Sequence, residues 1–473
     1  LGSAIGLEEA EPKALLSRLY EVFRLSEKNE NAYETACIRY AALMSGEELF
    51  LLSSEPSQEL LEQAEIIAES EPFVRIDRGF ERVYKTVKKS PVAPHTLQAC
   101  EAAFEKELSG LAGVDKKSFR LYNGGYSLKG SSDLAPIDGQ DIALTIDRDM
   151  QLLSQSLLKN AVDNGQCSGG SLCVTSCKTG EILAIASYPD FDLNNFSKDY
   201  ERLSSDSAAP LFDRSLCGLY RPGSAMKTIT ALAALDTKAI DKDTFLWCGR
   251  WFPLGDTTFS CLYYHGYENV QTALRDSCNV FFYKCSQLVG VDNLSSYQQK
   301  LGLGKSVDIG LPNAAGRVVT PESAAELGIV WSEGLLLQSA IGQSETAVTP
   351  LQMVQWAQII AGKGSLKPLT IRLDEHKASQ RIVKNDAAFE QIKQGMIMAA
   401  DNIWGEDSLY SLPEKTAIKT GTPETGSGYN STVIGFYPAD KPEIAFSIVL
   451  ENSENSKSLI RPLLEKWVSI SKA

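Results

Sequence analysis

The chain has 473 residues, of which 43% are hydrophobic and 22% are charged, and its formal net charge is −14. A chain of this length is longer than one hydrophobic core usually serves, so two or more domains are expected. The acidic balance excludes nucleic acid as the expected partner, because phosphate backbones are bound by clusters of basic side chains. No apolar run approaches the roughly 20 residues that a helix needs to cross a bilayer.

The first 140 residues are predicted to form a separate module. Residues 7–70 are charged and amphipathic, with apolar side chains at helical spacing, and this pattern predicts helices. The rest of the module is more mixed and is expected to be partly extended, because it contains turn-forming clusters at residues 123–125 and 130–133. We therefore place a domain boundary near residue 140, followed by a larger domain at residues 141–473.

The larger domain begins with strand and helix patterns in alternation. Residues 142–146 predict a strand, and residues 149–164 predict a helix. Residues 170–175 and 180–186 then predict a hairpin whose turn contains Lys178-Thr179-Gly180.

The end of the chain predicts a second hairpin, formed by residues 431–437 and 444–451, and a closing helix at residues 459–471. Between the two hairpins, residues 220–400 are predicted to be mostly helical. Strands at both ends of the domain around a helical middle indicate an α+β fold, in which helices cover one antiparallel sheet.

A serine and a lysine stand three residues apart where a helix is predicted to begin. Tyr220-Arg221-Pro222-Gly223 breaks the chain, so Ser224 is expected to open the helix and to share a face with Lys227. A serine hydroxyl is a poor nucleophile until a neighbouring base removes its proton. The chain has only three histidines, none of them near Ser224 in sequence, so lysine is favoured as the base over a histidine triad.

Two further motifs follow in chain order. Ser277-Cys278-Asn279 comes first, and Lys419-Thr420-Gly421-Thr422 ends an extended run near the end of the chain. In a strand, Lys419 and Gly421 lie on the same side, and a glycine lets a ligand backbone approach closely. The earlier Lys178-Thr179-Gly180 lies in a turn and is not expected to be functional. Each motif alone is weak, but the ordered set of three is not.

Lys227 can act as a base only if its pKa falls. A free lysine titrates near 10.4, so neutrality at pH 7 requires a drop of about three units, or roughly 4 kcal/mol. A second ammonium group at about 4 Å supplies about 4 kcal/mol at an effective dielectric constant of 20. We therefore expect Lys419 to cause the shift without deep burial of Lys227.

One short stretch concentrates groups that can bind a metal. Cys248, Cys261, His265 and Cys278 include three of the ten cysteines and one of the three histidines. Thiolates and an imidazole at this spacing can close a tetrahedral zinc site. A disulfide between Cys248 and Cys261, or free thiols, are the alternatives.

The motif set resembles that of the class B penicillin-binding proteins, the monofunctional D,D-transpeptidases. The resemblance extends from about residue 140 to the end of the chain and includes Leu144-Thr145-Ile146-Asp147 and Ile341-Gly342-Gln343. It implies a penicillin-binding, serine β-lactamase-like transpeptidase domain that follows an N-terminal pedestal domain. Residues 101–110 are similar to the pedestal signature of this class, although Ser109 stands where an arginine is usual.

The resemblance also implies a reaction. Ser224 would attack the penultimate D-alanine of a peptidoglycan stem peptide, expel the last D-alanine and form an acyl-enzyme, which an amine of a second stem would resolve into a cross-link. β-Lactams would acylate the same oxygen. Lys227 would take the serine proton, and Ser277 and Asn279 would relay it and hold the substrate amide.

Substrate binding is assigned to the last motif in the same way. Lys419 and Thr420 would bind the substrate carboxylate, beside the close approach that Gly421 permits. The backbone amides of Ser224 and Thr422 would form the oxyanion hole. Catalysis would require no cofactor, so a zinc ion would be structural. A D,D-carboxypeptidase and a catalytically silent penicillin-binding scaffold or sensor remain as alternatives.

The resemblance finally implies a place in the cell and a partner. The chain begins with Leu1-Gly2-Ser3 and lacks an initiator methionine. We expect it to act at the extracytoplasmic face of the bacterial cytoplasmic membrane, with an N-terminal anchor that is absent from this chain. The module of the first 140 residues does not resemble a glycosyltransferase, so a separate glycosyltransferase is expected to supply the glycan.

Overall fold

The computed structural model describes residues 94–110, 114–122, 125–134, 137–375, 377–426 and 428–471, with side chains left out at residues 114–134. The chain divides into two compact units, Leu1–Val83 and Tyr84–Ala473, and every described residue belongs to the second. The helices predicted within residues 7–70 lie outside the described residues. The domain boundary near residue 140 stays a prediction.

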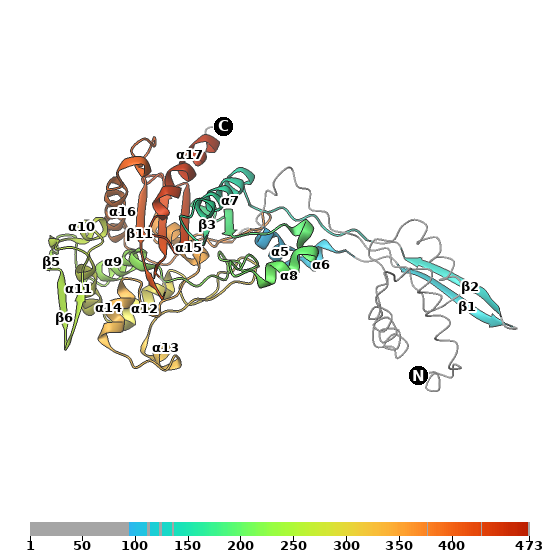
Figure 1. The fold of residues 1–473 in the computed structure, drawn as a ribbon, viewed down its shortest axis with the longest axis horizontal. Coiled ribbons are helices and arrows are strands. Elements are labelled where there is room, and N and C mark those ends of the chain that lie inside the picture. The colour runs from blue at the N-terminus through green and yellow to red at the C-terminus, as the bar shows by residue number, and fades with distance from the viewer. Residues whose placement is uncertain are drawn as a thin grey trace. The chain divides into compact units, whose positions relative to one another are not determined.

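The second unit is built on a five-stranded antiparallel sheet in the order β11-β14-β15-β3-β4 (Figure 1). Its strands are rich in β-branched and small apolar residues, and most of their side chains are buried because both faces are covered. The two predicted hairpins are confirmed and lie side by side in one sheet, as the α+β class requires. The strands are β3 (Gly169–Ser176), β4 (Ile182–Tyr188), β11 (Ala417–Gly421), β14 (Ser431–Tyr437) and β15 (Ile444–Glu451).

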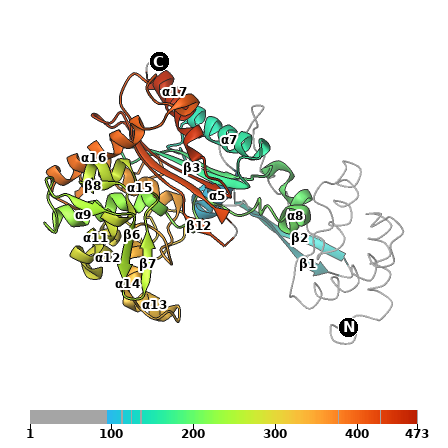
Figure 2. The same ribbon diagram turned by 60° about the vertical axis from the view of Figure 1, so that its left-hand side comes forward.

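Helices pack on both faces of this sheet (Figure 2). Leu172 and Val174 of β3 point into one hydrophobic core, which they share with α7 (Arg148–Asp163) and α17 (Ile460–Ser471). Cys173, between them, points into the larger core on the other face. The predicted helices at residues 149–164 and 459–471 are therefore confirmed within one or two residues at each end.

The larger core is formed by the helical middle of the chain. Its central members are α9 (Lys227–Asp236) and α15 (Pro350–Ala361), in which nearly every residue is buried. Around them lie helices and short turns: η2 (Gly223–Met226), α10 (Val270–Arg275), α11 (Asn279–Val289), α12 (Val291–Lys300), α13 (Pro321–Glu326), α14 (Glu333–Ala340) and α16 (Asp386–Asp401).

Short strand pairs and turns complete the unit. The strand pairs are β5 (Leu246–Cys248) with β8 (Gly266–Glu268), β6 (Trp251–Leu254) with β7 (Thr257–Ser260), β9 (Ser365–Leu366) with β10 (Gln380–Arg381), and β12 (Glu424–Thr425) with β13 (Gly428–Tyr429). The remaining helical elements are η1 (Leu193–Asn195), α8 (Phe196–Ser205), η3 (Gly405–Asp407) and η4 (Ser456–Leu459).

The N-terminal part of the described chain contains α5 (Pro94–Ala103), α6 (Glu105–Leu108) and a hairpin of β1 (Val114–Tyr122) and β2 (Gly125–Leu134). Cys100 and Phe104 are buried in the larger core. Glu107 pairs with Arg372, whose Nη1 lies 2.9 Å from the carboxylate. The segment similar to the pedestal signature is thus packed against the domain that carries the sheet.

Two local predictions are wrong. Residues 130–133 do not form a turn but lie within β2, because Gly130 pairs with Ser118 of β1 next to a shift in register. Residues 142–146 form no regular strand. Leu144 makes a single bridge to Arg372, and the Thr145 hydroxyl donates to the carbonyl of Ile182 instead of continuing a ladder.

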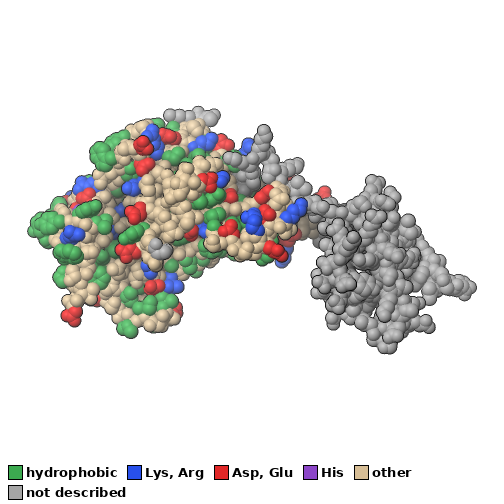
Figure 3. Space-filling model, in the orientation of Figure 1, with side chains coloured by type: hydrophobic (Ala, Val, Ile, Leu, Met, Phe, Trp, Pro, Cys, Tyr) green, Lys and Arg blue, Asp and Glu red, His purple; other side chains and the backbone are tan. Residues whose placement is uncertain are grey.

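Two properties of the described part of the chain bear on its partners. Figure 3 shows acidic and basic side chains interspersed over the drawn face of the second unit. Among the described residues, no helix has the length and apolar character needed to span a bilayer.

Candidate active site

The fold brings the three sequence motifs together. Ser224 lies in η2, a short 3-10 turn that continues directly into α9 at Lys227, so the serine precedes the α-helix by one turn. Ser277 comes just before α11, which begins at Asn279. Lys419 lies in β11, one of the two edge strands of the five-stranded sheet.

Lys227 is the central donor of the site. Its side chain is fully buried, and its Nζ donates to the Ser277 carbonyl at 2.7 Å, to the Ser277 hydroxyl at 3.1 Å and to Asn279 Oδ1 at 2.6 Å. The ring of Phe282 lies 5.8 Å from the same nitrogen. An ammonium group has three hydrogens, so these three acceptors satisfy it completely.

Lys419 approaches the same hydroxyl from the sheet. Its Nζ donates to Ser277 Oγ at 3.2 Å and to its neighbour Thr420 O at 2.9 Å. Ser277 has a φ of 55°, which is uncommon for a residue with a side chain. Such strained conformations gather at functional sites, where the surrounding structure holds them. The Ser277 hydroxyl therefore lies between two lysines that are far apart in sequence.

β11 also reaches the turn that carries Ser224. A Cβ added to Gly421 would lie 3.0 Å from the Ser224 nitrogen and 2.6 Å from the Pro222 carbonyl. Gly421 is buried and Thr420 is half-buried, whereas Thr422 is exposed. The glycine is thus required by the close approach of the Ser224 turn, a protein backbone, where sequence reasoning anticipated a ligand backbone.

The pKa values of both lysines are depressed. Burial is the main cause and lowers the pKa of Lys227 to about 8. Burial followed by repulsion from Lys227 lowers the pKa of Lys419 well below its usual range. The expectation that Lys419 would shift the pKa of Lys227 without deep burial is therefore wrong, because Lys227 is fully desolvated.

The four predicted metal ligands also meet. One donor atom from each of Cys248, Cys261, His265 and Cys278 lies within 4.8 Å of every other. His265 Nδ1 is 3.4 Å from the Cys261 sulfur and 3.6 Å from the Cys248 sulfur. All three cysteines are free and buried, so the structure contains no Cys248–Cys261 disulfide. A hydrogen bond from Cys278 holds the pKa of Cys261 below its usual range.

This cysteine cluster is joined to the second motif. Cys278 stands between Ser277 and Asn279, and the Asn279 backbone nitrogen donates to the Cys261 sulfur at 3.1 Å. The Asn279 side chain donates to the Ser260 carbonyl at 3.2 Å, next to Cys261. The cluster therefore holds the residue that accepts a hydrogen bond from Lys227.

Sequence reasoning missed several supports of the site. Thr432 of β14 donates to the Pro222 carbonyl at 2.8 Å, and the Gly223 nitrogen donates to the Gly342 carbonyl at 2.9 Å. Gly342 lies in the Ile341-Gly342-Gln343 match, which gave a signal for this contact. Thr432 lies in an ordinary strand pattern and gave none.

Comparison with known proteins finds a matching family model and similar curated proteins. Residues 170–466 match the model of the penicillin binding protein transpeptidase domain. The peptidoglycan D,D-transpeptidase MrdA of Acinetobacter baumannii is 27% identical over 413 residues, which cover 78% of this chain and 59% of that protein. The chain thus spans about six-tenths of the length of the curated relatives it matches.

Solved structures agree with the family model. PBP2 of Pseudomonas aeruginosa in complex with WCK 5153 has a TM-score of 0.64 and 25% identity, and the match covers 71% of this chain and 79% of that one. PBP2 of Helicobacter pylori, from its complex with MreC, has a TM-score of 0.75 over 98% of this chain and 92% of that one. At 20% identity, this second likeness concerns the fold alone.

Proposed function

Because this chain belongs to the family of penicillin-binding protein transpeptidase domains, we propose that it is a class B D,D-transpeptidase that cross-links peptidoglycan stem peptides. The observation that carries the proposal is the meeting of Lys227 and Lys419 on one hydroxyl, that of Ser277, beside the Ser224 turn. Two buried lysines at a serine turn suit acyl transfer to and from a serine oxygen.

In the acylation step, Ser224 Oγ bonds to the carbonyl carbon of the penultimate D-alanine, and its proton passes to neutral Lys227. The neutral amine has two hydrogens, which can remain on the Ser277 carbonyl and Asn279 Oδ1. Its lone pair is then available for the serine proton. The peptide bond breaks, and the amine of the last D-alanine leaves with a proton that Lys227 returns through the Ser277 hydroxyl.

The second step resolves the acyl-enzyme. An amine of a neighbouring stem attacks the ester carbonyl and loses its proton to the same lysine. The ester bond to Ser224 Oγ then breaks, and the lysine returns that proton to Oγ, which leaves as the free hydroxyl. Lys419 and Thr420 supply hydrogen-bond donors for the substrate carboxylate, whose negative charge favours the protonated form of Lys419. The backbone nitrogens of Ser224 and Thr422 supply the oxyanion hole, a role that the close packing of β11 on the serine turn supports.

The proposal is tested with purified protein, a synthetic stem peptide that ends in D-Ala-D-Ala, and an acceptor amine. Wild type is expected to release D-alanine and to form the cross-linked peptide, whereas Ser224→Ala does neither. Release of D-alanine without cross-linking would instead identify a D,D-carboxypeptidase. No turnover at all would identify a silent scaffold.

We propose a place of action and partners on the basis of the same family. We place the protein at the extracytoplasmic face of the cytoplasmic membrane, where the glycan comes from a separate glycosyltransferase and β-lactams act as inhibitors of Ser224. Among the structures with the same fold, PBP2 of H. pylori has been solved in a complex with MreC. Nucleic acid is not a partner that the net charge of −14 favours.

We also infer that Cys248, Cys261, His265 and Cys278 bind a structural zinc ion. Tetrahedral zinc with Zn–S bonds of about 2.3 Å places its sulfur ligands about 3.8 Å apart. The Cys261 and Cys278 sulfurs are 4.0 Å apart, and the imidazole nitrogen lies slightly closer to its two sulfurs, as shorter Zn–N bonds require. The ion would hold β5 and the segment between β7 and α11 together and take no part in the acyl transfer.

Elemental analysis tests this inference. Wild type is expected to contain one zinc ion per chain and to lose thermal stability on chelation, because metal binding favours the folded state. Cys248→Ser should lose the zinc ion. Cys285→Ser is the matched control, since both side chains are fully buried, and it should retain the ion. Metal-free wild type with unchanged stability would contradict the inference.

A further inference from the structure

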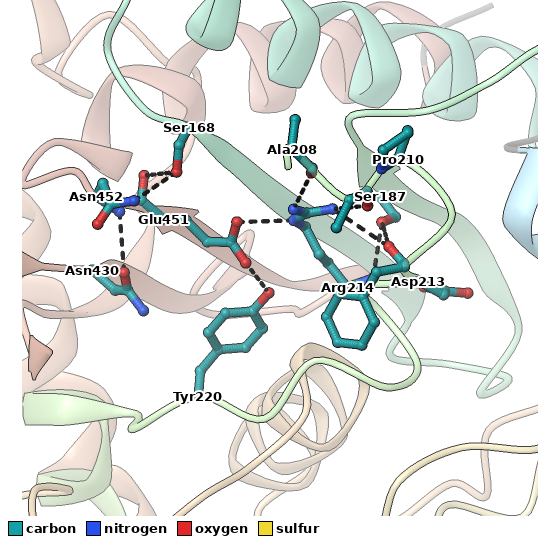
Figure 4. Close-up of polar contacts among 12 residues, drawn as sticks. Ser168, Ser187, Ala208, Pro210, Asp213, Arg214, Tyr220, Asn430, Glu451 and Asn452 are labelled. Atoms are coloured by element: carbon teal, nitrogen blue, oxygen red, sulfur yellow. Dashed lines mark hydrogen bonds and ion pairs between the residues drawn. The ribbon is translucent and has the colours of Figure 1, made fainter. Parts of the chain in front are cut away.

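A partly buried carboxylate lies at the end of β15 and contacts the segment that leads to Ser224 (Figure 4). Glu451, the last residue of β15, accepts a hydrogen bond from Arg214 Nε at 2.9 Å on one carboxylate oxygen. Its other oxygen accepts from the Tyr220 hydroxyl at 2.7 Å. One carboxylate thus joins the sheet to two points of the chain before the nucleophile.

Arg214 donates hydrogen bonds from both its guanidinium and its backbone nitrogen. Its guanidinium donates to the Ala208 carbonyl at 2.9 Å and to the Ala209 carbonyl at 3.1 Å, and its backbone nitrogen donates to Ser187 Oγ at 2.9 Å. The arginine side chain is 6% exposed and that of Glu451 is 21% exposed. An ion pair that is largely withdrawn from water gives little net stability, because desolvation offsets the attraction. Its value here is that it specifies one geometry.

The space around this network allows little movement. A Cβ on Gly169 would lie 2.7 Å from the Glu451 carboxylate and 2.8 Å from Arg214 Nε. A Cβ on Gly218 would lie 2.8 Å from the Tyr220 hydroxyl. The side chains of Glu451, Arg214 and Tyr220 lie directly against the backbone at these two positions, so glycine is required at both.

Tyr220 begins a segment that is fixed at successive positions up to Ser224. The Tyr220 nitrogen and carbonyl both bond to Val348, each at 2.9 Å. The Pro222 carbonyl and the Gly223 nitrogen are held by Thr432 and Gly342, as described above. The Tyr220 side chain adds an anchor to the opposite end of this segment from Ser224.

We propose that Tyr220 is a positioning residue for acylation: its hydrogen bond to Glu451, itself fixed by Arg214, sets the backbone position from which the Ser224 hydroxyl attacks. The proposal rests on the proposed function and names a residue outside the three motifs. It predicts a defect in the rate of the chemical step, because small misplacements of a reacting group slow a reaction strongly.

Tyr220→Phe tests the proposal, since it removes one hydroxyl and leaves the Arg214–Glu451 pair in place. Stopped-flow acylation by a fluorescent penicillin is expected to give an acylation rate constant about tenfold lower than that of wild type. The dissociation constant of the non-covalent complex and the final labelled fraction should be unchanged. A structural role alone would lower the labelled fraction and leave the rate constant of the labelled molecules as it was.

Tyr297→Phe is the matched control. Tyr297 is buried to the same extent as Tyr220, at 6% exposure, and its hydroxyl also donates to a carboxylate, that of Asp236. It lies outside the segment that leads to Ser224, so its removal should leave the acylation rate constant unchanged. An equal loss of rate in both variants, or wild-type acylation by Tyr220→Phe, would overturn the proposal.

Glu451→Ala, which removes both acceptor oxygens, identifies the partner through which Tyr220 acts. In that background, Tyr220→Phe should change the rate constant by less than about twofold, because the two residues act as one unit. A further tenfold loss would overturn the assigned route. The failures are distinguishable: absence of wild-type acylation contradicts the proposed function, whereas normal acylation by wild type and Tyr220→Phe alike contradicts only this inference.

Discussion

A lysine that serves as a base must lose its proton near neutral pH, and burial of Lys227 favours that loss. Its side chain has no exposed surface, and desolvation lowers its pKa to about 8. A group with this pKa is uncharged in about one molecule in ten at pH 7. The acceptors that surround the ammonium group, Ser277 and Asn279, still hold two hydrogens of the neutral amine.

The acylation rate constant is therefore expected to rise with pH and to level off once the pH passes about 8. The protonated amine, which cannot accept the Ser224 proton, dominates below this pKa, so the rate falls on the acid side. Lys227→Arg keeps a positive charge at every pH and should slow acylation by about 100-fold or more. Stopped-flow acylation across this range checks the prediction, and a rate independent of pH would refute the role of Lys227.

At the level of elements, the site depends on how closely β11 packs on the turn between Pro222 and Ser224. The last pair in the ladder between β11 and β14 joins Gly421 to Thr432, whose hydroxyl also holds the Pro222 carbonyl. One edge of the sheet therefore positions both the nucleophile and the lysine that is proposed to bind the carboxylate. Gly421 and Thr432, which make these contacts, both lie in strands.

Gly421→Ala is expected to separate these elements. The added methyl would lie 2.5 Å from the Thr432 hydroxyl and 2.6 Å from the Pro222 carbonyl, so β11 must shift. We expect a loss of about 1–3 kcal/mol in the free energy of unfolding, together with slower acylation. Gly426→Ala is the control, because an added Cβ there meets nothing within 4 Å. Thermal unfolding and acylation kinetics of both variants check this, and wild-type behaviour of Gly421→Ala would contradict it.

At the level of the whole molecule, local sequence patterns predicted the helices and strands but not which of them lie next to one another in the fold. The hairpins around Lys178-Thr179-Gly180 and between β14 and β15 are short-range features, so their periodicity and turns were sufficient. The pairing of β15 with β3 joins residues more than 260 positions apart, such as Ile448 with Leu172, and no local pattern encodes it. For the same reason, the turn expected at residues 130–133 gave way to pairing with β1.

The residues of the site could be predicted from the sequence, but their environment could not. The order of the motifs identified the residues that meet around Ser277, and the spacing of the cysteines identified the cluster of possible metal ligands. The burial of Lys227 and the anchoring of Tyr220 by Glu451 arise from tertiary packing, which spacing does not express. The sequence therefore predicted which residues form the site, and the structure adds how burial and hydrogen bonding set their pKa values and positions.

The most direct test of the account is the site of covalent attachment of a β-lactam. Intact-mass analysis after incubation is expected to show one adduct per chain, and peptide mapping should place it on the peptide that contains Ser224. Ser224→Ala should show no adduct. An adduct on another residue, or one that persists in Ser224→Ala, would contradict the assignment of Ser224 as the nucleophile.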